Sequence, residues 1–171
     1  MAVDQNGDVF AADTYGHNVL ELPWTGSSYG HEITIANGLE GGAGAPLNLV
    51  IDAANNLYIS EQYTGSTGTF ELVKVPYSGG AYGTAFVIPV NNLQAIENVA
   101  LDSLGNIYVA DQVSQQIYKL DVADPPTTTF ANTNVDSVSS DSSKTVTVTN
   151  IGNASLPLLP EPIQPIHSTS Q

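Results

Sequence analysis

The sequence contains no cysteine and no arginine, and only three lysines stand against its seventeen acidic residues. Without cysteine, the chain has no disulfide, no thiolate metal ligand and no thiol nucleophile. Without arginine, it lacks the planar side chain that binds phosphates and carboxylates through two hydrogen bonds. A net charge of -14 repels phosphate backbones. The composition therefore excludes nucleic acid as a favoured partner and favours cationic, neutral or metal ligands.

The sequence also lacks long apolar runs. No stretch approaches the roughly 18 apolar residues that span a bilayer, and residues 1–13 contain no basic segment followed by an apolar one. We therefore expect no membrane insertion and no signal peptide within this chain. Abundant Ser, Thr, Asn and Gly with scarce lysine is typical of an extracytoplasmic or secreted bacterial protein, whose secretion signal would lie upstream in a longer parent.

What the sequence does contain is a repeat. Three segments of similar pattern align without gaps, and the spacing from Asp4 to Asp52 is 48 residues and from Asp52 to Asp102 is 50 residues. A fixed period of about 20–50 residues is typical of solenoids and propellers. Each segment has an apolar residue, an aspartate, a turn and an alternating strand that ends in an acid. The segments are Val3–Asp13, Ile51–Glu61 and Leu101–Asp111.

Each segment predicts a β-hairpin, because a Gly or Asn stands where a tight turn needs a positive φ. A third strand follows each hairpin, and a fourth follows in the first two copies. Four antiparallel strands per period are typical of a propeller blade. We therefore predict an all-β fold of about three four-stranded blades in an incomplete ring. The predicted third strands are 19–22, 70–75 and 117–120, and the predicted fourth strands are about 31–36 and 81–89.

The pattern apolar-Asp-x-x-Gly-Asn-apolar-Tyr-apolar-Ala-Asp, seen most fully in Leu101–Asp111, resembles the NHL repeat. The resemblance covers residues 1–121 and implies NHL-like blades over residues 1–124. Relatives of this kind close their ring with about six blades, which implies that further blades are missing here. Two prolines then interrupt the repeat pattern, and residues 125–156 resemble the opening strands of an Ig-like sandwich of the ASH type. Residues 157–171 carry four prolines and are predicted to be disordered.

Acidic residues recur at two places in the repeat. Those before the turn are Asp4, Asp52 and Asp102, and we interpret them as acceptors for backbone N–H groups of the turn. Those at the end of the second strand are interpreted as fastening the next loop. The alternative for this second set is that the acids converge on a central channel and bind a hard cation such as Ca²⁺. The candidate metal ligands are Asp13, Glu61 and Asp111.

Two further sets of residues are candidates for function. His17 with Asp13 is the one acid–base pair that we nominate for catalysis. Aromatic residues in the predicted loops either pack locally or form a contact surface for a peptide or glycan. The candidate ligand-binding residues are Tyr15, His17, Trp24, Tyr29, Tyr63 and Tyr77, with Tyr82 beside them.

The favoured interpretation is a non-enzymatic scaffold or recognition module, without a cofactor, of a secreted or surface bacterial protein. It would bind a protein, peptide or glycan through its blade loops. One alternative is a propeller lyase or lactonase-type hydrolase with a divalent cation in the channel, and another is a purely structural spacer. Because three blades leave two sheet faces uncovered, we also expect a homo-oligomer that completes the ring or poor behaviour in solution.

Overall fold

A computed structural model of the chain describes residues 1–37, 39, 44–63, 69–122 and 150–153. Every element named within these ranges is a β-strand, and every strand pair is antiparallel. The all-β fold class predicted from the repeat is therefore confirmed. The predicted ASH-type strands at 125–156, apart from residues 150–153, and the predicted disorder at 157–171 lie outside the described residues.

Three sheets follow one another along the chain, each with its strands in sequence order. The first sheet contains β1 (Ala2–Val3), β2 (Val9–Asp13), β3 (Asn18–Leu22) and β4 (Ile33–Asn37). The second sheet contains β5 (Gly44–Ile51), β6 (Leu57–Tyr63), β7 (Phe70–Val75) and β10 (Phe86–Ile88), and the third contains β11 (Ile96–Leu101), β12 (Ile107–Asp111) and β13 (Gln116–Leu120).

The prediction of one strand over residues 81–89 is wrong. A short hairpin, made of β8 (Tyr77–Ser78) and β9 (Ala81–Tyr82), separates from the three-residue strand β10. The hairpin closes because the Gly83 N–H donates to the Pro76 carbonyl oxygen over 2.7 Å, which turns the chain before β10 begins. The first sheet repeats this arrangement, with Gly30 donating to Pro23 over 2.8 Å before β4.

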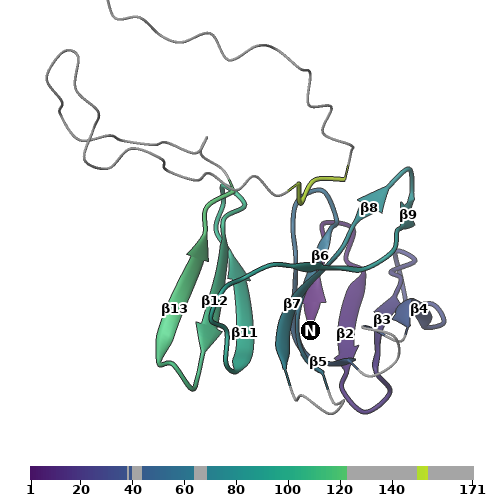
Figure 1. Ribbon diagram of the computed structural model, residues 1–171. Helices are drawn as coiled ribbons and strands as arrows, with labels where there is room; N and C mark the ends of the chain where they lie inside the picture. The colour runs from purple at the N-terminus through teal and green to yellow at the C-terminus, as the bar shows by residue number, and fades with distance from the viewer. Residues whose placement is uncertain (38, 40–43, 64–68, 123–149, 154–171) are drawn as a thin grey trace, which may run out of the picture.

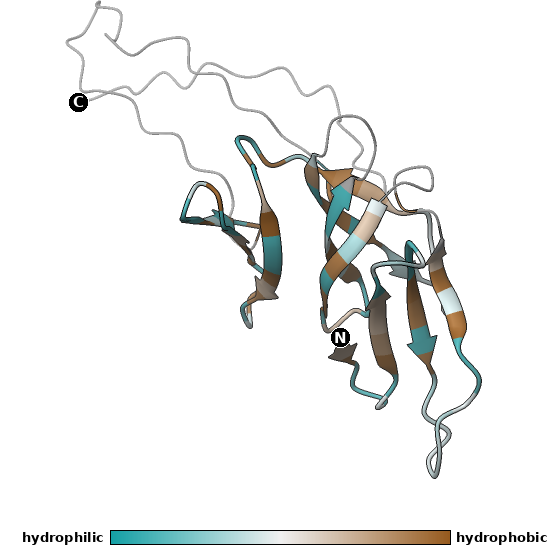
Figure 2. Ribbon diagram, turned by 90° about the horizontal axis from the view of Figure 1, so that it is seen from below, coloured by the Kyte–Doolittle hydropathy of each residue, from teal (hydrophilic) through white to brown (hydrophobic). Residues whose placement is uncertain are grey.

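The three sheets stack face to face in chain order, with the second sheet in the middle (Figure 1). Side chains alternate between the two faces of a strand, and β6 shows the consequence. Leu57 and Ile59 belong to the core cluster shared with the first sheet, whereas Tyr58 belongs to the cluster shared with the third. Figure 2 shows the same alternation as hydrophobic and hydrophilic bands along the strands. The second sheet is consequently buried on both faces.

The first and third sheets each bury one face against the second sheet. Within the described residues the three sheets form an open row rather than a closed barrel. The short segment 150–153 lies against the second sheet, where the Lys74 Nζ donates to the Ile151 carbonyl oxygen over 2.7 Å (Figure 1). Ile151 also packs against the core cluster between the second and third sheets.

Candidate functional site

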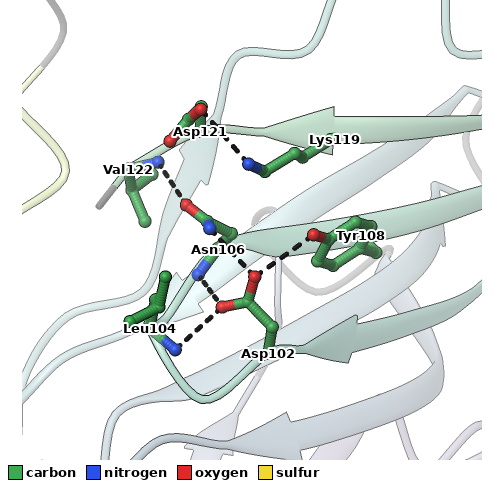
Figure 3. A network of polar contacts seen from close by, with 7 residues as sticks. All are labelled: Asp102, Leu104, Asn106, Tyr108, Lys119, Asp121 and Val122. Carbon is green, nitrogen blue, oxygen red and sulfur yellow. Dashed lines mark hydrogen bonds and ion pairs between the residues drawn. The ribbon is translucent and has the colours of Figure 1, made fainter. Parts of the chain in front are cut away.

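The aspartate before each hairpin turn is held by the turn itself, and Asp102 shows the arrangement most fully (Figure 3). One carboxylate oxygen accepts the backbone N–H groups of Leu104 and Asn106, each over 2.9 Å. The other accepts the Asn106 side-chain amide over 2.9 Å and the Tyr108 hydroxyl over 3.1 Å. The hydrogen bond from the Asn106 side chain, with those from the backbone, outweighs desolvation and lowers the pKa of Asp102.

The same turn occurs in the other two repeats. Asp52 accepts the backbone N–H groups of Ala54 and Asn56, each over 2.9 Å, and Asp4 accepts the two equivalent groups over 2.9 and 2.8 Å. The turn residue has a positive φ of 92° at Gly7, 63° at Asn55 and 90° at Gly105. The interpretation of these recurrent acids as acceptors for the turn is therefore confirmed.

The residue that ends each turn also fixes the chain beyond the third strand. The side-chain oxygen of Asn56 accepts the Tyr77 N–H over 2.9 Å, and that of Asn106 accepts the Val122 N–H over 3.1 Å. In the first repeat Asp8 accepts the N–H of Trp24. Sequence reasoning missed this role, although Asn or Asp recurs at the aligned position in all three repeats.

The acids at the end of the second strand have different surroundings from one repeat to the next. Asp111 is buried, at 2% exposure, and accepts four backbone N–H groups over 2.7–3.1 Å. Burial raises the pKa of Asp111, but the four backbone donors outweigh this effect and lower it overall. Asp13 accepts the Gly16 N–H over 2.9 Å, and the fully buried Glu61 lies against Gly44.

These three acids do not form a cation site among the described residues, because no group of three or more His, Cys, Asp or Glu there is arranged to hold a metal ion. Calcium binding by Asp13, Glu61 and Asp111 therefore stays a prediction. The loop acids Asp13 and Asp111 accept N–H groups of the loops that follow them, as the sequence-based interpretation expects.

The nominated catalytic residue His17 lies between the first and second sheets. Its Nδ1 atom is 3.0 Å from the Gly44 carbonyl oxygen, at the start of β5. The neighbouring Thr14 hydroxyl donates to the Pro46 carbonyl oxygen over 2.7 Å. Both contacts fasten the β2–β3 loop to β5. Asp13 and His17 thus bind different backbone groups, which gives the imidazole a positioning role in the fold.

The candidate aromatic residues fall into two pairs of the same geometry. The ring centroids of Trp24 and Tyr29 are 5.0 Å apart and those of Tyr77 and Tyr82 are 4.9 Å apart, with interplanar angles of 60° in both pairs. Tyr82 also packs edge-on against Phe10 of the first sheet, at 6.0 Å between centroids. Trp24 and Tyr29 remain 40% and 50% exposed.

The other two loop tyrosines were predicted to share this aromatic surface. Tyr15 is 95% exposed in the β2–β3 loop. Tyr63 is the last residue of β6, and its side chain lies outside the description. The aromatic candidates whose side chains the structure describes are therefore distributed over separate places, and Tyr77 and Tyr82 border a cleft.

The β8–β9 hairpin lies beside the first sheet, with Tyr82 against Phe10 (Figure 1). The cleft lined by residues of both has a volume of about 430 Å³. Its lining includes Asp4, Asp8 and Glu21 of the first repeat and Tyr77 and Tyr82 of the second. Burial, followed by the charges of Asp8 and Asp4, raises the pKa of Glu21. Burial and the charge of Glu21 raise the pKa of Tyr82. We call this feature the acidic cleft.

Sequence reasoning missed the acidic cleft because its residues come from two repeats. A signal was nevertheless present in the alignment of the third strands. Strand register pairs Glu21 with Phe10, Lys74 with Tyr58 and Lys119 with Tyr108, so these three pairs are equivalent. The first repeat thus has an acid where the other two have a lysine.

A scan against protein-family models finds no match for this chain, and a search of the curated proteins finds no relative. The resemblance to NHL repeats and to an ASH-type domain therefore depends on the motifs alone. No helix in the described residues is long and apolar enough to cross a membrane. Fold and site together define an all-β protein of stacked antiparallel sheets with an acidic, tyrosine-lined cleft.

Proposed function

We propose that this chain is a non-enzymatic recognition module on a β-propeller scaffold, part of a secreted or surface bacterial protein, and that it binds a basic peptide segment of a partner protein. The observation that carries the proposal is the acidic cleft between the first sheet and the β8–β9 hairpin. The compositional argument for an extracytoplasmic protein supports the location.

What supports the propeller scaffold is the repetition of one sheet topology. The first and second sheets have the same four-strand order with a hairpin or bridged turn before the last strand, and the third sheet has the same first three strands. Successive sheets stack on the same pair of faces. Radial repetition of four-stranded sheets in this manner builds a propeller.

The chemistry of the cleft supports a cationic ligand. Three carboxylates provide charged acceptors for an ammonium or guanidinium group. The two tyrosines that line the same cleft can attract a cation through the π faces of their rings. A net charge of -14 would accelerate the encounter with a basic partner. A lysine or arginine side chain of a peptide satisfies all three features, and an anionic or wholly apolar ligand satisfies none.

The hydrogen bonds of the nominated catalytic residues favour binding over catalysis. General acid–base catalysis needs a side chain within hydrogen-bonding reach of the reacting group. His17 instead contacts the Gly44 carbonyl oxygen and Asp13 accepts a loop N–H, so both serve the backbone.

A pair of matched variants tests the proposal. Glu21→Gln removes one charge from the cleft at nearly constant size, and Glu32→Gln removes one charge from an exposed position outside it. Binding of a lysine-rich peptide is measured by calorimetry, with a glutamate-rich peptide of equal length as the control ligand. We expect Glu21→Gln to weaken binding about five- to tenfold, as expected for one charge-assisted contact, and Glu32→Gln to change it less than about twofold.

Binding of the lysine-rich peptide should also weaken with added salt, because salt screens the attraction between the positive peptide and the negative chain. Equal affinities of the two variants would remove the cleft from the proposal. The absence of any binding by the lysine-rich peptide at low salt would contradict the recognition of a basic segment.

A further inference from the structure

The outer face of the third sheet repeats a face that is buried elsewhere in the molecule. Strand register places Tyr108 beside Lys119 and Ala110 beside Ile117 on one face of the sheet. Because directly paired residues share a face, these four residues form the outer surface, which we call the open face. Ile117 is 75% exposed there.

The equivalent residues of the second sheet are Tyr58, Ser60, Leu72 and Lys74, which are buried in the same register against the third sheet. Tyr58 is 6% exposed and Lys74 is 3% exposed. The open face therefore has the chemistry of a surface that a further sheet covers.

The first sheet presents the opposite kind of surface. Its outer face carries Val9 beside Leu22 and Ala11 beside Leu20, and none of the four belongs to either core cluster. We call these four residues the rear face. The equivalent residues of the second sheet are all buried in the cluster with the first sheet, and they are Leu57, Ile59, Val73 and Val75.

Two interfaces of the same kind thus already exist in the chain. The rear-type face of the second sheet covers the first sheet, and the rear-type face of the third sheet covers the second. The surface equivalent to the open face is covered each time by a surface equivalent to the rear face. This order specifies which surface fits the open face.

The two aromatic hairpins independently indicate that the first sheet of a second copy fits the open face. The Tyr77–Tyr82 pair packs over Phe10 of the preceding sheet, and Phe10 is equivalent to Tyr108. The Trp24–Tyr29 pair has the same ring geometry, and within the described residues its rings stay 40% and 50% exposed. Tyr108 of a second copy would supply the surface that Phe10 supplies to the Tyr77–Tyr82 pair.

The lysine on the open face does not prevent such a contact. Lys74, its equivalent, is buried with its ammonium 5.4 Å from the centroid of the Tyr58 ring and bonded to a backbone carbonyl oxygen. Lys119 forms an ion pair with Asp121 at 3.2 Å, and both side chains are exposed. Contact between Lys119 and the rings of the Trp24–Tyr29 pair would add a cation–π interaction.

We propose that the open face of the third sheet binds the rear face and the Trp24–Tyr29 hairpin of a second copy of this chain. The contact joins two different surfaces and is therefore head-to-tail. It leaves the acidic cleft uninvolved, so peptide binding and self-association can fail separately.

Two variants block one surface each. Ile117→Glu places a charge on the open face and Leu20→Glu places one on the rear face, and Leu104→Glu, at an exposed turn position off both faces, is the control. Light scattering across a range of concentrations should show association of the wild-type chain and of Leu104→Glu. Ile117→Glu and Leu20→Glu should each lose at least about tenfold in association constant.

Mixing the two blocked variants provides the decisive measurement. Each retains one of the two complementary surfaces, so an equimolar mixture should form a dimer and nothing larger. The chain has a single tryptophan, and its emission should shift to the blue as the dimer forms, because Trp24 of the Ile117→Glu copy becomes buried.

A mixture that stays monomeric, or a wild-type chain that stays monomeric with constant emission, overturns the proposal. Dimerisation of Leu20→Glu alone also overturns it, because that result means a symmetric contact between open faces. If circular dichroism shows either variant unfolded, Trp24→Ala leaves both sheet faces intact and should weaken association measured by light scattering. Unchanged association of Trp24→Ala would remove the hairpin from the contact.

Discussion

Removal of the Asp111 carboxylate should destabilise the third sheet more than removal of any exposed acid. The carboxylate joins the end of β12 to the segment before β11, because it accepts the backbone N–H groups of Gln94 and Ala95 as well as two from its own loop. Asp111→Ala deletes all four hydrogen bonds. The hydrogen bonds are intramolecular and backbone-directed, so no other side chain replaces them.

The loss of unfolding free energy in Asp111→Ala depends on which of the four N–H donors can form a hydrogen bond with water instead. Ala95 is buried, and a buried N–H without an acceptor costs about 1–3 kcal/mol. Gln94 and Val113 are exposed, so water replaces part of what their N–H groups lose. We expect Asp111→Ala to lower the free energy of unfolding by about 3–4 kcal/mol. Asp111→Asn keeps one acceptor oxygen and should cost about 1–2 kcal/mol.

Urea denaturation followed by far-ultraviolet circular dichroism measures both values, with a lower midpoint and an unchanged slope as the expected result. Asp121→Asn is the matched control, because it removes an acid from an exposed ion pair and should cost less than about 1 kcal/mol. A cost for Asp111→Ala no larger than that of the control would refute the assignment of a structural role to this carboxylate.

The Asp111 carboxylate should also make the stability of the fold depend on pH, and the direction of its pKa shift determines the direction of that dependence. The pKa of Asp111 is lower in the folded protein than in the unfolded chain. Its contribution to stability is therefore fully present above the unfolded value of about 3.9 and is lost as the pH falls through the lower folded value. Asp111→Asn should flatten the acid limb of a plot of urea midpoint against pH, and an unchanged limb would contradict the sign.

Three further results are expected. In Gly44→Ala the new Cβ would lie 2.6 Å from a Glu61 carboxylate oxygen and 2.9 Å from the Leu39 carbonyl oxygen. This crowding should lower the free energy of unfolding by about 1–3 kcal/mol, measured by thermal denaturation. An unchanged melting curve would contradict it. Burial lowers the pKa of Lys74. As the pH rises toward 10.5, the urea midpoint of the wild type should therefore rise relative to that of Lys74→Met. Parallel curves of urea midpoint against pH would exclude this contribution of Lys74 to stability. Calcium should leave the melting temperature unchanged because the Asp111 oxygens already accept four N–H groups. A calcium-dependent rise in melting temperature that Asp111→Asn abolishes would instead support the cation site.

The local turn was predictable because all of its contacts lie close together in the sequence. Asp102 and the donors to its carboxylate are within six residues of each other, so the order of residues alone brings them together. The alternation after the turn likewise predicted a strand that ends in an acid, and β2 and β12 end at Asp13 and Asp111. In contrast, the single strand assigned to residues 81–89 was wrong because Ala81 and Tyr82 pair with Ser78 and Tyr77, and the Gly83 bond closes that hairpin before β10 begins.

The candidate site was less predictable, because burial depends on contacts between repeats. The acidic cleft combines Glu21 of the first sheet with Tyr82 of the next repeat, and the partner of Lys74 is Ile151, 77 residues further along the chain. Neither contact follows from periodicity. The alignment indicated only that position 21 is exceptional.

Trp24 and Tyr77 show where the two kinds of information separate. The sequence by itself determined their shared local structure, since a preceding proline and a glycine six residues on close the same hairpin in both repeats. Only the tertiary structure decided that the Tyr77–Tyr82 pair covers Phe10 and borders a cleft while the Trp24–Tyr29 pair stays exposed. The physical reason is that turn geometry depends on neighbouring residues, whereas burial depends on whether another sheet is present to pack against.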